Sequence, residues 1–172
     1  MNRRKAVAVL SFTPLISAQA KDSSVRKKFM GVWKLVSCES KNKTSGEVRY
    51  PFGRNPVGRI TYDQAGRMSA LLMNPGRRPV GGSPTRGVTA VIGDASCDEI
   101  REMVTGFTAY LGTFEIDESA RTVIHHVRAS LIPSWVGTDL RRTYEFSSAS
   151  QLVLTAATDL GTTRLVWQRD DA

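Results

Sequence analysis

The stretch "VGRITYDQAGRMSALLM", residues 57–73, contains two short β-prone segments on either side of a four-residue turn. Val57–Tyr62 and Arg67–Met73 are rich in β-branched, aromatic and aliphatic residues. The intervening Asp63–Gly66 begins with Asp and ends with Gly, which is typical of a tight connection between antiparallel strands. The stretch therefore predicts a β-hairpin.

The same alternation of β-prone segment and turn extends in both directions from this hairpin. It indicates about nine strands joined mostly by short loops, which is typical of an antiparallel meander, sandwich or barrel. The fold class is therefore all-β. The other predicted strands are Gly31–Ser40, Val48–Tyr50, Tyr110–Ile116, Arg121–Leu131, Thr138–Phe146, Gln151–Ala156 and Thr163–Arg169.

One region between the strands has a different pattern. Apolar residues recur at helical spacing from Ile100 to Phe107, and Ser96 with Glu99 matches a capping box, so one short helix is expected. It follows residues 74–93, a Pro-, Gly- and Arg-rich stretch without periodicity. A loop of this length inside a compact domain is either a functional lid or a disordered segment, and both alternatives stay open.

The first twenty residues resemble a secretory signal peptide. Arg3, Arg4 and Lys5 precede a short apolar run, and Ala18 and Ala20 form a small-x-small cleavage site. The run is too short to span a bilayer, so no transmembrane anchor is expected. We predict cleavage near Ala20 and export to the periplasm or medium, by a route left open. The alternative is a disordered basic tail on a cytosolic domain.

Length and charge indicate a single basic domain. Residues 21–30 form a polar lead, and 31–170 form the domain. Cleavage would remove three positive charges from the formal net charge of +8 and leave +5. An exported protein has no duplex DNA to bind, so no nucleic-acid partner is expected. The surplus charge is predicted to aid solubility or attract anionic ligands.

Both cysteines, Cys38 and Cys97, lie in the predicted mature chain. An oxidising compartment would permit a disulfide between them. Closing a loop of about 60 residues would stabilise the fold by ~4 kcal/mol. The alternative is two free thiols, and the sequence leaves both alternatives open.

The only two histidines, His125 and His126, are adjacent on a predicted strand and must point to opposite faces. They cannot readily bind one metal together, so no metal site is expected. The face that carries His125 is the more apolar and should point inward. On the next strand, the apolar face carries Arg142 and Tyr144. Polar groups on two inward faces predict a cavity that binds a ligand.

Longer motifs resemble a known family. "GVWKLVSCE" (31–39) resembles the Gly-x-Trp opening of lipocalins and the wider calycin group, and "LVWQR" (165–169) resembles their closing strand. With these, three internal phrases are similar to the bacterial and fungal lipocalin-like domain family, so the resemblance covers Gly31 to Arg169. The phrases are "YPFGRNPVGRITYDQAGRMSA" (50–70), "FTAYLGTFEID" (107–117) and "TVIHHVRASLIPSWVGTDLRRTYEF" (122–146).

The resemblance implies a small up-and-down antiparallel barrel of about eight or nine strands, closed at one end. It also implies that Arg169 lies across Trp33. Such a cation–π contact is worth ~0.5–2 kcal/mol. Related calycin barrels carry small hydrophobic molecules or catalyse cyclisations and isomerisations in the cavity. The resemblance supplies no agreed catalytic residues.

The leading functional hypothesis is non-covalent binding of a small, partly hydrophobic molecule that carries a polar or anionic group. His125, Arg142 and Tyr144 would orient it, and aromatic residues would fence the cavity mouth. Each of these residues also has a structural alternative: a hydrogen-bonded core imidazole, a carboxylate-paired arginine, or rim packing. The predicted ligand-binding residues are His125, Arg142, Tyr144, Trp135, Tyr50 and Phe52.

Two other functions are compatible with the same residues. A cofactor-free cyclase, isomerase or hydratase would use His125 as acid or base, Tyr144 as proton donor and Arg142 to stabilise negative charge. A structural envelope protein would instead have a filled barrel and bind a partner on its outer surface. No cofactor is expected in any of these cases. The sequence leaves the ligand and the oligomeric state open.

Overall fold

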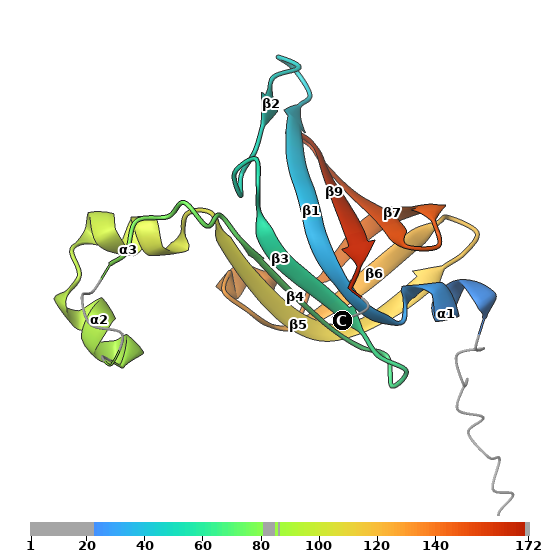
Figure 1. Ribbon diagram of the computed structural model, residues 1–172, viewed down its shortest axis with the longest axis horizontal. Coiled ribbons are helices and arrows are strands. Elements are labelled where there is room, and N and C mark those ends of the chain that lie inside the picture. The colour runs from blue at the N-terminus through green and yellow to red at the C-terminus, as the bar shows by residue number, and fades with distance from the viewer. Residues whose placement is uncertain (1–22, 81–84, 86, 171–172) are drawn as a thin grey trace, which may run out of the picture.

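The computed structural model describes residues 23–80, 85 and 87–170 (Figure 1). The predicted signal peptide lies outside these residues. Nine antiparallel strands form one sheet in the order β2-β1-β3-β4-β5-β6-β7-β8-β9, and pairing of β1 with β9 closes it. The strands are β1 (Gly31–Asn42), β2 (Val48–Arg49), β3 (Val57–Tyr62), β4 (Arg67–Met73), β5 (Phe107–Asp117), β6 (Thr122–Ser130), β7 (Asp139–Ser148), β8 (Gln151–Thr158) and β9 (Gly161–Arg169).

The closed sheet confirms the predicted up-and-down barrel. Eight strands form the barrel wall, and the two-residue β2 pairs only with the far end of β1. The hairpin β3–β4 has the predicted bounds, because the signals that set them are local. The structure has three α-helices rather than the one expected, and none is long and apolar enough to span a membrane within the described segments. They are α1 (Ser24–Phe29), α2 (Val88–Asp94) and α3 (Cys97–Val104).

The predicted helix is α3, and the expected capping box between Ser96 and Glu99 is present. The helix ends at Val104, earlier than its apolar spacing suggested, because Gly106 has a positive φ of 72° and the chain then enters β5. Helix α1 was missed because it is only six residues long, and its two apolar residues, Val25 and Phe29, are too few to show a helical period.

Helix α1 and an arginine close one end of the barrel, which we call the closed end. Phe29 is fully buried and makes edge-on ring contacts with Tyr62, Tyr144 and Phe146. The Arg169 guanidinium lies 4.2 Å from the centre of the Trp33 ring, which confirms the contact implied by the family resemblance. Arg169 also donates hydrogen bonds to the carbonyls of Met30 and Lys28. These contacts join β1, β9 and α1.

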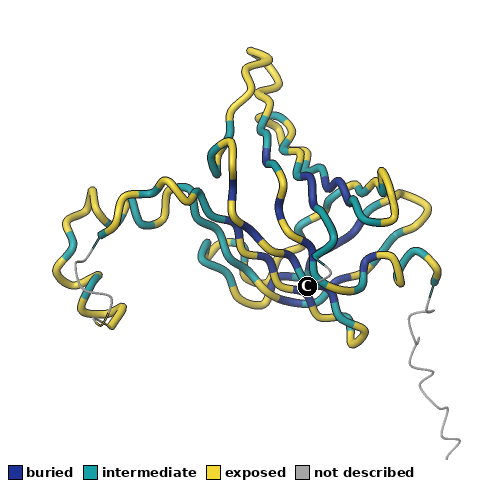
Figure 2. Tube along the Cα trace, in the orientation of Figure 1, coloured by how far each residue is buried: buried dark blue, intermediate teal, exposed yellow. Residues whose placement is uncertain are grey.

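The opposite end of the barrel, which we call the open end, is more exposed to solvent. On β8, Leu152 and Leu154 are buried, but Ala156 is only partly buried. On β5, Phe114 is buried and Tyr110 is partly exposed. Figure 2 shows the buried residues along the barrel strands, whereas the β1–β2 connection and the α2–α3 segment are mostly exposed. Side chains on the inner wall are therefore less completely buried towards the open end.

A β-bulge in β6, at Arg128, requires a glycine opposite it on β5. The register between β5 and β6 shifts between Leu111 and Gly112, and a Cβ at Gly112 would lie 1.9 Å from the His126 carbonyl oxygen. We expect Gly112→Ala to lower the free energy of unfolding by about 2–3 kcal/mol, because β5 must move away from β6. Urea denaturation measures this loss. Gly93→Ala is the control, since no atom lies within 4 Å of its Cβ position, and equal losses would contradict the prediction.

Candidate functional site

The centre of the barrel contains a hydrogen-bonded network around His125. This residue lies on β6 and is fully buried, which confirms that its face points inward. Its Nε2 lies 2.9 Å from the Tyr62 hydroxyl, and its Nδ1 lies 3.0 Å from the Tyr110 hydroxyl. Because a neutral imidazole has one donor and one acceptor nitrogen, one tyrosine donates and the other accepts. Both ring nitrogens are thus satisfied by the protein.

The surroundings keep this network uncharged. Burial, followed by the positive charges of Arg142 and His126, lowers the pKa of His125 to about 3. Burial raises the pKa of both Tyr62 and Tyr110 above the usual tyrosine range. At neutral pH all three groups are therefore neutral. An imidazole with so low a pKa is poorly suited to proton transfer near pH 7.

Arg142 on β7 lies beside this network. Its strand alternates partly buried residues at even positions with exposed residues at odd positions, so Arg142 faces inward and Arg141 outward. The positive charge of Arg142 opposes the effect of burial on the pKa of Tyr110. Its Nη1 donates a 2.9 Å hydrogen bond to the Arg141 carbonyl. Among the described residues, no carboxylate forms an ion pair with Arg142, so the expected structural alternative is not found there.

Tyr144 is the predicted site residue that lies away from His125. Its ring packs on Phe29 and Phe146 at the closed end. Burial, and then the charge of Glu118, raise the pKa of Tyr144. The β6–β7 register explains this position, because the residue opposite His125 is Leu140.

The two tyrosines that do contact His125 were missed. Tyr62 ends β3, and Tyr110 lies on the inward face of β5. The alternation of inward-facing and outward-facing side chains along each strand indicated that both tyrosines point inward. Their contact with His125 depends on the stagger of separate strands, which the local sequence does not encode.

The predicted aromatic residues of the cavity mouth are all partly buried. Trp135 lies in the 3-10 helix η1 (Pro133–Trp135) after β6, and its ring meets that of Tyr110 edge-on at 5.9 Å. Tyr50 and Phe52 lie between β2 and β3. The Arg54 guanidinium lies 4.4 Å from the centre of the Tyr50 ring, and Phe52 packs against the core. The structure thus brings Trp135 next to the central network.

His126 lies on the other face of β6, as expected. Its Nδ1 is 2.6 Å from Asp139, and its Nε2 is 3.7 Å from Glu115. In the described part of the chain, no group of three or more His, Cys, Asp or Glu side chains is placed to hold a metal ion. Cys38 and Cys97 are both free, so the disulfide alternative is not found. Burial raises the pKa of the Cys38 thiol to about 12.

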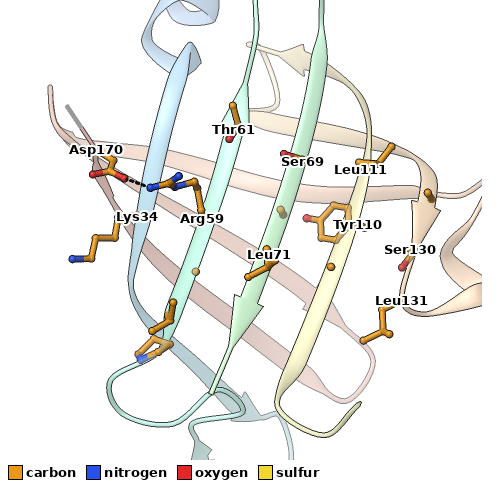
Figure 3. Close-up of a pocket in the computed structure, with 16 residues that line it drawn as sticks. Lys34, Arg59, Thr61, Ser69, Leu71, Tyr110, Leu111, Ser130, Leu131 and Asp170 are labelled. Carbon is orange, nitrogen blue, oxygen red and sulfur yellow. Dashed lines mark hydrogen bonds and ion pairs between the residues drawn. The ribbon is translucent and has the colours of Figure 1, made fainter. Parts of the chain in front are cut away.

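A separate groove of about 930 Å³, which we call the outer groove, lies on the outside of β1 and β3–β6 (Figure 3). Its floor includes Val57, Leu71 and Leu111, whose exposed fractions are 51, 42 and 50%. Lys34 and Arg59 lie at one edge with Asp170, and Arg59 pairs with Asp170 at 3.0 Å. The sequence alternation predicted which residues face outward but gave no sign that they form a groove.

Comparison with known proteins gives one family. The sequence matches the lipocalin-like domain family over residues 30–169. No curated protein matches the chain. A redesigned β-barrel has 11% identity and a TM-score of 0.41, with 85% of this chain and 95% of that chain covered. A de novo designed fluorescence-activating β-barrel has 10% identity and a TM-score of 0.41, with coverage of 86% and 99%.

Proposed function

Because the chain belongs to the lipocalin-like domain family, we propose that it is an exported protein whose barrel binds a small, partly hydrophobic molecule. The barrel fold of this family supports the binding of small molecules. The ligand would occupy the half of the barrel nearer the open end, since aromatic side chains fill the closed end. Residues 1–20, with their signal-peptide pattern, support export.

The observation that carries this proposal is the inward-facing Arg142. A guanidinium that is partly withdrawn from water without a counter-ion is costly. A carboxylate or similar anionic group on the ligand would compensate this cost through charge-assisted hydrogen bonds. Tyr110, held by His125, lies beside Arg142 and supplies a second polar contact. We therefore propose a ligand with an apolar body and an anionic end.

Two neighbouring arginines provide a matched test. The probe is 1-anilinonaphthalene-8-sulfonate, which has an apolar ring system and one anionic group. Arg142→Leu is expected to weaken its binding at least ~10-fold, measured by fluorescence titration, because the charged contact is lost. Arg141→Leu removes the same charge from the outer face and should change the affinity less than ~2-fold.

Two further results can contradict this proposal. Leu111→Asp alters the outer face of β5, where Leu111 lines the outer groove and the hollow next to it, so a loss of probe binding in that variant would place the probe outside the barrel. Native mass spectrometry of protein from its natural host should show a chain that begins at Lys21 and a retained small molecule. A retained molecule that Arg142→Leu does not release would contradict the assigned contact.

The enzymatic alternative has less support. A cyclase, isomerase or hydratase would require His125 to exchange a proton with substrate. Both nitrogens of His125 are bonded to tyrosines, and its pKa is about 3. We therefore do not propose catalysis by this residue.

A further inference from the structure

The segment between β4 and β5 carries a second exposed apolar surface. We call residues 88–104, which comprise α2 and α3, the arm. Figure 1 shows that the arm projects away from the barrel. Neither helix contains a buried residue, and Val88, Ile92 and Val104 are 71, 46 and 45% exposed. Exposed apolar clusters of this kind mark interaction surfaces.

We propose that the arm of one copy of this chain binds in the outer groove of a second copy, and that the exchange is reciprocal. The product is a symmetric dimer with two identical arm–groove contacts. This proposal does not depend on the small-molecule function, because the groove residues that it uses, Val57, Leu71 and Leu111, are exposed on the outer face, and Tyr110, which also lines the groove, is left unchanged in the test.

The two surfaces match in chemistry and length. Val57, Leu71 and Leu111 of the groove offer apolar contacts, as do Val88 and Ile92 of the arm. Val88 and Ile92 are four residues apart, so they lie on one face of α2. A helix of seven or eight residues is about 10–12 Å long, and residues 57–61 of an extended strand span about 16 Å. Each helix therefore fits along the groove.

The two surfaces also carry opposite charge. Residues 88–104 contain four carboxylates and one arginine, a formal charge of −3, which the ion pair of Glu102 with Arg78 beside the arm reduces to −2. The outer groove and the hollow next to it are lined by four basic and two acidic side chains, a net charge of +2. These are Lys34, Arg59, Arg67 and Arg128, with Asp63 and Asp170. Complementary charge of this kind favours the encounter of arm and groove.

The root of the arm favours a groove on another copy. The Asn74 N–H donates a 2.7 Å hydrogen bond to the Gly106 carbonyl, which extends the β4–β5 pairing. Arg77 donates to the Met103 carbonyl at 2.5 Å, and its guanidinium lies 4.9 Å from the centre of the Phe107 ring. These contacts direct the arm away from its own barrel wall. An arm held in this direction meets the groove of a second copy without a change at these contacts.

Mixing two variants tests this exchange directly. The arm variant is Val88→Asp with Ile92→Asp, and the groove variant is Leu71→Asp with Leu111→Asp. In sedimentation experiments we expect the wild type to dimerise, and each variant alone to dimerise at least ~100-fold more weakly. An equimolar mixture should recover a heterodimer, because one intact arm then meets one intact groove.

Controls and contrary outcomes separate this arrangement from others. Val136→Asp with Leu160→Asp changes exposed apolar residues elsewhere and should leave the dimer intact. If the aspartates in the groove prevent folding, Leu71→Ser with Leu111→Ser replaces them as the groove variant. We expect it to show the same weaker dimerisation on its own and the same heterodimer in the mixture. The proposal is overturned by a wild type that is monomeric at ~100 μM. It is equally overturned by a dimer that survives either variant, or by a mixture that forms no heterodimer.

Discussion

Replacing Trp33 with alanine is expected to lower the free energy of unfolding by about 3–5 kcal/mol. The side chain is fully buried, and its indole N–H donates a 2.8 Å hydrogen bond to the Phe29 carbonyl. Its ring also receives the Arg169 guanidinium. The substitution therefore leaves a cavity and weakens the contacts that hold α1, β1 and β9 together. Urea denaturation followed by far-UV circular dichroism measures the loss.

Trp135→Ala is the matched control for this experiment. Trp135 is only partly buried and lies outside the closed end, so its loss should cost about 1 kcal/mol. A double-mutant cycle between Trp33→Ala and Arg169→Ala should give a coupling of about 0.5–2 kcal/mol. Equal losses for the two tryptophans would show that the closed end does not depend on Trp33.

His125→Ala is expected to destabilise the protein by about 3–5 kcal/mol. The change removes a fully buried ring and leaves the Tyr62 hydroxyl, on a residue only 1% exposed, without its partner. His126→Ala removes a partly exposed ring from the outer face and should cost less than ~1 kcal/mol. Urea denaturation of the two variants at pH 7.5 gives the comparison.

The pH dependence of the free energy of unfolding tests whether the neutral form of His125 stabilises the fold. The pKa of His125 is about 3 in the folded protein, below its ordinary value of 6.5. The unfolded chain therefore binds a proton between these values when the folded protein does not, so stability falls as the pH decreases below 6.5. Between pH 7 and pH 5 the wild type should lose about 2 kcal/mol.

His125→Ala should remove most of that slope. Carboxylates with lowered pKa values, such as Asp63 and Glu99, change the free energy of unfolding mainly at lower pH. They therefore contribute little to the slope between pH 7 and pH 5. An unchanged slope in the variant would show that another group causes the acid sensitivity.

The sequence predicted the structural features that depend on local residue patterns. Strands β3 and β4 have the expected bounds because their turn residues lie between them. The inward position of His125 followed from alternation along one strand. The Trp33–Arg169 contact was implied by two terminal motifs of the family.

What the sequence did not predict depends on the register of distant strands. Tyr62 is 63 residues from His125 in the chain, and their contact requires β3, β5 and β6 to be aligned in the closed barrel. Tyr144 was grouped with His125 as a residue that orients the ligand, but the β6–β7 pairing carries it towards the closed end. Helix α1 was missed because its six residues include only two apolar positions, Val25 and Phe29, which is too short a pattern to indicate a helix.

The contacts of Arg169 with Lys28 and Met30 bring the first and last described segments to the same end of the barrel. A linker joined to either of these described segments therefore leaves the barrel at the closed end. The rim around Trp135 then points away from the attachment. Protein immobilised through either segment should keep that rim accessible to dissolved molecules.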